Sequence, residues 1–204
     1  MSESPLKRNS KSNLERLLQE MLDRPASEAE ITREIEEEFG ETRAVLALDM
    51  SGFSRTTQRR GIVAFLLMIH QMKRIARPVI EANDGIVVKA EADNLFCLLE
   101  TTTGAIKAAR EIIGRLETVN LVLPEDRRLY ASIGIGWGRI LNVDERDLFG
   151  DEVNLASKLG EDVAEKNQIL LTQAAQAIAA QSGLDTREAS VSISGLTLNY
   201  YQLV

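Results

Sequence analysis

Two aspartates stand at the edges of apolar, strand-like runs, where a rigid sheet can fix the positions of side chains. Asp49 ends the apolar run 44–48, and Asp93 lies between the runs 86–89 and 95–99. A sheet can hold two such carboxylates close enough to share divalent cations, whose preferred ligands include carboxylate oxygens. The pair therefore indicates phosphate chemistry, although an aspartate after a buried strand also serves as a turn former or helix cap.

A third polar segment spans residues 146–159 and carries Asp147, Asn154 and Lys158. The four-residue spacing of Asn154 and Lys158 places them on one face of a helix, where an amide and a cation can act on one substrate. A lysine on the exposed side of a helix is also ordinary. Taken in order, the three segments resemble the catalytic domain of the class III nucleotidyl cyclases, over about residues 43–204.

The resemblance implies a reaction and a metal site. In this family the ribose 3′-hydroxyl attacks the α-phosphorus of a nucleoside triphosphate, and two divalent cations, Mg²⁺ or Mn²⁺, assist the attack. By resemblance, Asp49 and Asp93 hold both cations, and the backbone carbonyl of Met50 completes one site.

The resemblance also assigns residues to the base and the ribose. Lys89 and Asp147 occupy the positions that read adenine, since a lysine donates to a ring nitrogen and an aspartate accepts from the exocyclic amine. ATP is therefore the favoured substrate. Asn154 is expected to orient the ribose, and Lys158 to stabilise charge on the phosphate.

Lys158 departs from the family, which normally has arginine there. Lysine lacks the planar fork that forms two hydrogen bonds at once. Three readings stay open: an adenylate cyclase, a cyclase of altered base choice that uses GTP or a pyrimidine nucleotide, and a lapsed cyclase-like domain that binds a nucleotide or a partner.

The triphosphate has further expected contacts. The loop 51–54 follows a strand and precedes a helix, so its N–H groups can face phosphate, and Gly52 allows close backbone approach. Gly52, Phe53 and Arg139 are the remaining expected substrate-binding residues. In the family one subunit supplies the metal carboxylates and its partner the base-reading residues, so the resemblance implies a homodimer with shared sites, acting in cyclic-nucleotide signalling.

Composition limits the other possibilities. The 204 residues are 44% hydrophobic and 27% charged, enough for one buried domain and a modest extension. The net charge of −7 argues against a nucleic-acid or anionic-membrane surface. The single cysteine excludes an internal disulfide, and the lack of a signal peptide or long apolar run leads us to expect a cytoplasmic protein.

Residues 1–42 are expected to form a polar tail and two short amphipathic helices, and residues 43–204 the catalytic domain. Ser12 and Ser27 each begin a capping-box spacing, and Pro25 separates the two helices. Their apolar stripes can pack against the body of the same chain or against a second chain, as a dimerisation or regulatory element.

The rest of the chain alternates strands and helices. Strands are expected at 44–48, 86–89, 95–99 and 129–134, with helices at 57–83 and 103–116. This is the β-α-β-β-α-β order of a ferredoxin-like α/β (α+β) sandwich. The expected buried face of the first helix comprises Ile62, Val63, Phe65, Leu66, Ile69, Met72, Ile75 and Ala76. Additional C-terminal elements are expected at 153–164, 168–171, 173–181, 189–193 and 198–204.

Overall fold

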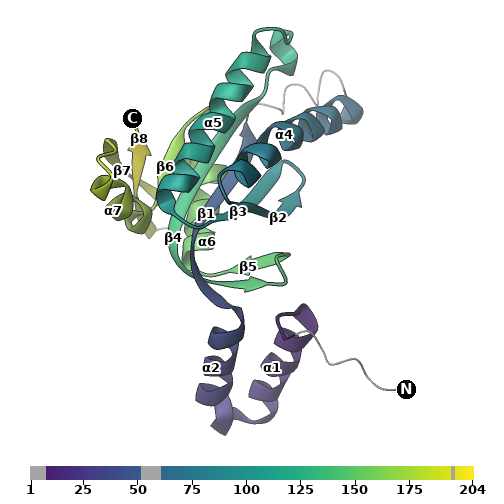
Figure 1. Ribbon diagram of the computed structural model, residues 1–204, viewed down its shortest axis with the longest axis vertical. Helices are drawn as coiled ribbons and strands as arrows, with labels where there is room; N and C mark the ends of the chain where they lie inside the picture. The colour runs from purple at the N-terminus through teal and green to yellow at the C-terminus, as the bar shows by residue number, and fades with distance from the viewer. Residues whose placement is uncertain (1–7, 52–60, 194–195) are drawn as a thin grey trace.

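The computed structural model describes residues 8–51, 61–193 and 196–204 (Figure 1). The strands are β1 (Gly40–Ser51), β2 (Ile86–Glu91), β3 (Asn94–Leu99), β4 (Tyr130–Val143), β5 (Asp147–Phe149), β6 (Ile169–Leu171), β7 (Thr186–Ile193) and β8 (Leu196–Leu203). The α-helices are α1 (Lys11–Asp23), α2 (Glu28–Phe39), α4 (Ile62–Ala82), α5 (Thr102–Asn120), α6 (Asp151–Lys158) and α7 (Gln173–Gln181). Short segments are the 3-10 turns η1 (Pro25–Ser27) and η2 (Glu125–Arg127) and the π-helical turn η3 (Leu159–Val163).

The strands form one mixed sheet in the order β2-β3-β1-β4-β6-β8-β7, with β5 paired to β4. Strands β2, β3, β1 and β4 are antiparallel neighbours, whereas β6 runs parallel to β4. The predicted ferredoxin-like order is confirmed, because β1 and β3 are central and each connection through α4 or α5 crosses one face of the sheet.

The two faces of the sheet are covered differently. Side chains alternate along β1, so Leu46, Leu48 and Met50 enter the main core with α4, α5 and α7, whereas Val45 and Ala47 pack with α6. Asp49 has the same parity as Val45 and Ala47. It therefore belongs to the face covered by α6 and η3, which we call the site face.

Helix α6 and η3 come into direct backbone contact with the sheet at two glycines. A Cβ atom at Gly134 of β4 would overlap the carbonyl oxygen of Ala156, and one at Gly160 would lie 2.8 Å from the carbonyl oxygen of Ala47. These two glycines permit backbone-to-backbone packing, so their lack of a side chain sets the height of α6 above the sheet.

Helix α4 corrects one prediction. Ile62, Val63 and Leu66 were expected on its buried face, but they are 60%, 75% and 56% exposed. Burial begins at Met68, because only the later turns of α4 lie over the sheet (Figure 1). A helical apolar stripe reports which side of a helix is apolar, and it does not report how far the neighbouring sheet extends.

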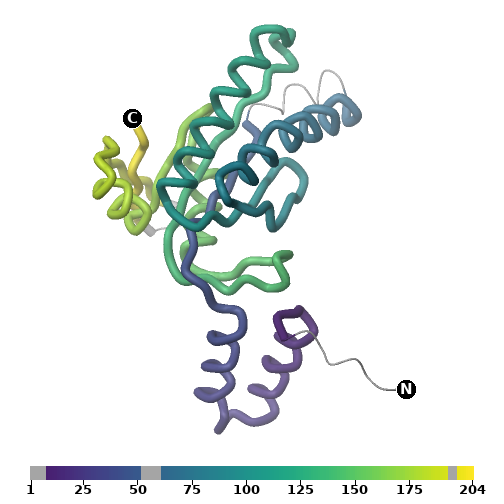
Figure 2. Tube along the Cα trace, viewed as in Figure 1, coloured from purple at the N-terminus to yellow at the C-terminus, as the bar shows by residue number. Residues whose placement is uncertain are grey.

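The N-terminal helices lie at the end of the molecule remote from the α4 and α5 layer, as the Cα trace in Figure 2 shows. Leu17, Ile35 and Phe39 bury their side chains between α1 and α2, together with Val143 from the end of β4. The N-cap of α1 is Ser10 and not the predicted Ser12, since the Ser10 hydroxyl accepts from the Asn13 N–H at 3.2 Å. In α1, Leu22 remains 75% exposed.

Two features of the site face were not predicted from periodicity. Strand β4 continues to Val143 and turns back into the three-residue strand β5. The predicted helix 153–164 ends its regular α-turns at Lys158 and continues as a π-turn, a form that occurs frequently at functional sites. Among the described residues, no helix has the length and apolar character needed to span a bilayer.

Candidate active site

Asp49 and Asp93 come from neighbouring parts of the sheet. Asp49 lies near the end of β1, opposite Ser132 of β4. Asp93 lies in the turn between β2 and β3, after Ala92, whose φ is 45°. Asp93 therefore follows directly on a residue with a left-handed backbone conformation, in a tight hairpin.

The electrostatics of Asp49 link this pair to η3. Burial, followed by the charges of Asp93, Glu161 and Asp162, raises the Asp49 pKa from 3.8 to about 7. The Met50 backbone N–H opposes the shift by hydrogen bonding to the charged form. Negative charge accumulates at this end of the sheet, so the free chain favours a proton on Asp49 where a cation could bind.

Glu161 and Asp162 were missed by the sequence analysis. Their spacing of three and four residues from Lys158 was the available signal, because it continues the helical face beyond that lysine. The Glu161 carboxylate accepts from the Ser157 hydroxyl at 2.5 Å, which ties η3 to the last turn of α6.

The residues at this end fit a pair of divalent cations. Carboxylate oxygens are the hard ligands that Mg²⁺ and Mn²⁺ prefer. Within the described ranges, the Ser51 hydroxyl and the Asn94 side-chain oxygen are buried without a hydrogen-bond partner, each within two residues of a carboxylate of the pair. No group of three or more acidic, histidine or cysteine ligands is assembled among these same residues. Met50 is buried in β1, and Gly52 and Phe53 lie outside the described residues.

A pocket of about 130 Å³ lies between the β2-β3 hairpin, β5 and α6. The Lys89 ammonium donates to Asp147 Oδ1 at 3.3 Å and lies 3.2 Å from Glu91 Oε1. Glu91 and then Asp147 raise the Lys89 pKa by hydrogen bonding to its charged form. The pocket is lined by Lys89, Phe96, Asp147, Leu148, Val153, Asn154 and Ser157. Three predicted substrate or catalytic residues thus meet at one hollow beside an aromatic ring.

Helix α6 positions the amide and the cation of the third segment. Asn154 is exposed and lines the pocket, and the exposed Lys158 follows one turn later where α6 meets η3. Glu152, which the sequence analysis missed, fixes the start of this helix. Its Oε2 accepts from the Trp137 N–H at 3.0 Å and from the Thr172 hydroxyl at 2.7 Å. Gly136 and Gly138 leave the space in which the Glu152 side chain lies.

Solved structures share this architecture. The chain superposes on the adenylate/guanylate cyclase/hydrolase from Silicibacter pomeroyi with a TM-score of 0.69 and 26% identity, covering 81% of this chain and 97% of that one. The chain has the fold of the class III adenylate/guanylate cyclase domains. The adenylyl cyclase CyaB from P. aeruginosa shares the fold at 17% identity, with a TM-score of 0.67 and coverage of 81% and 95%.

A curated relative agrees with this family. This chain is 30% identical over 116 residues to the Rhizobium meliloti (strain 1021) protein named "Putative adenylate cyclase 3". The match covers 57% of this chain and 20% of the relative, so this chain spans about a fifth of that protein's length. No protein-family model matches the chain. A guanylate cyclase domain from Catenaria anguillulae, in complex with GTP, has the same fold at 14% identity and a TM-score of 0.67, covering 80% and 96%. The fold is therefore common to adenylate-type and guanylate-type domains.

Arg139 lies apart from the pocket and the carboxylate pair. Its Nε donates to Glu36 Oε2 at 2.9 Å, and its Nη2 donates to the Glu36 carbonyl oxygen at 2.6 Å. Arg139 thereby connects β4 to the last turn of α2, directly before β1 begins at Gly40. Its predicted contact with a triphosphate stays a prediction.

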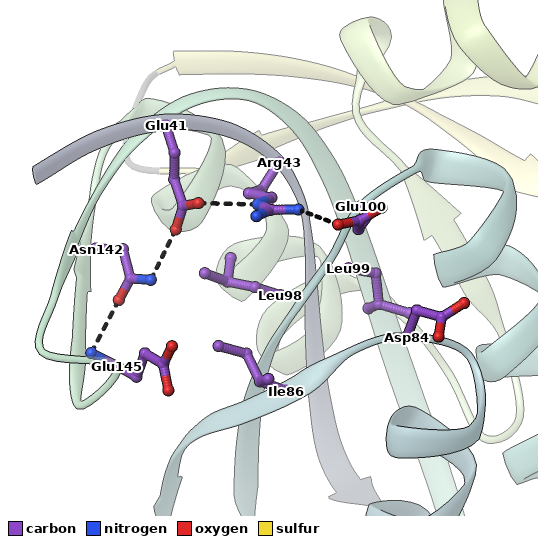
Figure 3. Close-up of a pocket in the computed structure, with 9 residues that line it drawn as sticks. All are labelled: Glu41, Arg43, Asp84, Ile86, Leu98, Leu99, Glu100, Asn142 and Glu145. Atoms are coloured by element: carbon purple, nitrogen blue, oxygen red, sulfur yellow. Dashed lines mark hydrogen bonds and ion pairs between the residues drawn. The ribbon is translucent and has the colours of Figure 1, made fainter.

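A second hollow, of about 210 Å³, lies at the far end of β1 from Asp49 (Figure 3). Arg43 bridges Glu41 at 2.9 Å and Glu100 at 3.2 Å, and Asn142 donates to Glu41 at 2.7 Å. Side chains from β1, from β4 and from Glu100, the residue after β3, are thus joined by polar contacts. This network holds the strands where the sheet meets the N-terminal helices, and it contains none of the predicted site residues.

Proposed function

We propose that this domain converts ATP to 3′,5′-cyclic AMP and pyrophosphate. The observation that carries the proposal is the pocket in which the Lys89–Asp147 pair and Asn154 meet, on the same face as Asp49 and Asp93. In the reaction the ribose 3′-oxygen bonds to the α-phosphorus, the bond to the β-bridging oxygen breaks, and the 3′-hydroxyl loses its proton.

The pocket chemistry favours adenine. The Lys89 ammonium can donate to a ring nitrogen, and the Asp147 carboxylate can accept from an exocyclic amine. Guanine presents a carbonyl oxygen where adenine presents that amine, so Asp147 would face an acceptor. In the free chain the two groups neutralise each other at 3.3 Å, and binding of adenine exchanges their mutual contact for contacts with the base.

The phosphate chemistry is assigned to the carboxylate pair and α6. Asp49 and Asp93 would hold two divalent cations, Mg²⁺ or Mn²⁺, which lower the pKa of the attacking hydroxyl and neutralise the leaving phosphates when bound. The raised Asp49 pKa means that binding of these cations displaces a proton below about pH 7. Asn154 orients the ribose, and Lys158 supplies a point charge for the phosphate.

A symmetric homodimer completes each site in this proposal. This pocket is lined by Lys89, Asp147 and Asn154, and its described lining contains neither Asp49 nor Asp93. Pairing of two site faces would bring the carboxylates of one subunit to the pocket of the other. Residues 1–42 are proposed to support this pairing.

The test is incubation of purified protein with ATP, GTP, CTP or UTP and either Mg²⁺ or Mn²⁺, with chromatography of the cyclic products. We expect cyclic AMP from ATP, and its loss in Asp49→Ala. Mixed dimers of Asp49→Ala and Asn154→Ala chains should regain one site per dimer. A different cyclic product would overturn the assignment of adenine, and no product from dimers that bind nucleotide would overturn the assignment of catalysis.

A further inference from the structure

The loop that follows η3 is anchored beside the carboxylate pair. The Ser132 hydroxyl donates to the Glu165 carbonyl oxygen at 3.2 Å, and Ser132 is the residue opposite Asp49 in the sheet. The Asn167 N–H donates to the Ala131 carbonyl oxygen at 2.7 Å, and the Ala131 N–H donates to Asn167 Oδ1 at 3.3 Å. Both neighbours of Lys166 are therefore fixed to β4 at the level of Asp49.

Lys166 places a positive charge at this end of the site face. Its ammonium lies 4.4 Å from the centroid of the Tyr130 ring, and Tyr130 is opposite Ser51 in the sheet. Because Tyr130 lies two residues from Ser132, its Cα is about 7 Å farther along β4 on the same face. The Lys166 ammonium therefore lies over the face of β4 that also carries Ser132, farther along the strand than Ser132.

The charge of Lys166 is not neutralised by a neighbour. Among the residues that the structure describes, no carboxylate lies within ion-pair distance of Lys166, although Asp49, Glu161 and Asp162 concentrate negative charge nearby. An exposed cation–π contact contributes only about 0.5–1 kcal/mol. A charge-assisted hydrogen bond to phosphate contributes more, so a phosphate oxygen can displace the ring as partner of the ammonium.

We infer that Lys166 binds the terminal phosphates of the nucleoside triphosphate. This inference rests on the proposed function, because it requires the triphosphate to lie across Asp49 and Asp93. The two cations of the site neutralise part of the triphosphate charge, and Lys166 supplies a further charge from the side of β4. The short anchored loop limits the cost of ordering the lysine, and Asn167, with φ of 60°, adopts the left-handed turn that returns the chain to the sheet.

The experiment measures binding and turnover separately. Isothermal titration with ATP, AMP and inorganic tripolyphosphate, each with Mg²⁺, is made on the wild type, Lys166→Gln, Lys166→Arg and the control Lys107→Gln. Lys107 is an exposed lysine of α5 on the opposite face of the sheet. We expect Lys166→Gln to weaken ATP and tripolyphosphate about tenfold and to leave AMP unchanged. Lys166→Arg should stay within about threefold of the wild type, and Lys107→Gln should equal it.

The outcomes separate this inference from the proposed reaction. Unchanged tripolyphosphate affinity in Lys166→Gln, or no tripolyphosphate binding by the wild type, overturns the role of Lys166. An equal loss for AMP and ATP also overturns it, because that result indicates a general disturbance of the fold. A tenfold loss of tripolyphosphate affinity in a protein that forms no cyclic product supports Lys166 and overturns only the proposed cyclase activity.

Discussion

The two parts of the site face differ in how their charges are balanced. In the pocket, Lys89 has two carboxylate neighbours, Asp147 and Glu91, and its ammonium is stabilised in the charged form. At the carboxylate pair, burial and the charges of Asp93, Glu161 and Asp162 raise the Asp49 pKa to about 7. The part that would read the base is therefore preformed in the free chain, whereas the part that would act on phosphate needs cations to complete it.

The largest expected effect comes from a substitution in the pocket, where the charges are balanced. Lys89→Gln removes the donor for the base and should lower kcat/KM for ATP about a hundredfold, since it removes a charged hydrogen bond and leaves Asp147 unmatched. Lys107→Gln, at an exposed lysine of α5, is the matched control. If the two halves are independent, the Mn²⁺ affinity measured by electron paramagnetic resonance stays within about twofold of the wild type. A large loss of Mn²⁺ affinity would show that the halves are coupled.

The next prediction concerns the carboxylate pair and is tested without any substrate. The native state holds the Asp49 proton up to about pH 7, whereas the unfolded chain releases it near 3.8, so stability falls as pH rises through this window. Asp49→Asn removes this loss. At pH 8, without divalent cations, we expect the variant to be more stable by about 1–2 kcal/mol, less than the full shift implies because Asp49 is partly solvated.

Urea denaturation between pH 4 and pH 8 checks this expectation. The advantage of Asp49→Asn should shrink toward pH 4, where the wild type no longer carries the destabilising charge difference. Added Mg²⁺ or Mn²⁺ should stabilise the wild type and not the variant. Asp162→Asn removes a smaller contribution and should give a smaller gain. A constant difference across the pH range would contradict the assignment of the shift to Asp49.

A third prediction concerns Glu152, which joins α6 to the sheet. Glu152→Ala removes the acceptor for the Trp137 N–H and the Thr172 hydroxyl, and it should lower the free energy of unfolding by about 1–2 kcal/mol. Because α6 carries Asn154, we expect kcat to fall several-fold while KM changes less. Glu152→Gln retains a side-chain acceptor and should recover most of both losses. Equal damage in both variants would show that the negative charge, and not the hydrogen bonding, is required.

The smallest effect lies in the hairpin that presents Asp93. Ala92 has φ of 45°, which costs an L-residue about 1–2 kcal/mol, and glycine avoids most of that cost while losing more chain entropy. Ala92→Gly should therefore stabilise the domain by about 0.5–1 kcal/mol in urea denaturation. Ala90→Gly, in the regular part of β2, should destabilise it by a similar amount. Destabilisation by both changes would show that the hairpin is not strained at Ala92.

The sequence predicted the core order of the fold well, because the strands and helices there have clear periodicities. It failed where an element extends beyond its neighbours, as at Ile62 and Val63 of α4. Periodicity also gave no sign of the three-residue β5 or of the π-turn, since both are too short for a repeating pattern.

The candidate site was predicted less evenly. Lys89 and Asp147 are 58 residues apart, and only the resemblance to cyclases suggested that they meet, as they do at 3.3 Å. Glu152 and Lys166 resembled ordinary surface charges in the sequence. The roles proposed for them depend on contacts with β4, which the fold of the whole sheet creates. Local sequence patterns do not indicate such contacts.

The backbone-to-backbone contacts at Gly134 and Gly160 limit which substitutions these positions tolerate. Rotamer adjustment cannot absorb an added methyl group where one backbone touches another, so any substitution at these positions displaces all of α6 and η3 as a unit. Such a displacement would shift Asn154 and Lys158 together with Glu161 and Asp162. The distance between α6 and β4 thus fixes the positions of these side chains. Relatives of this chain should therefore vary least at these two glycines.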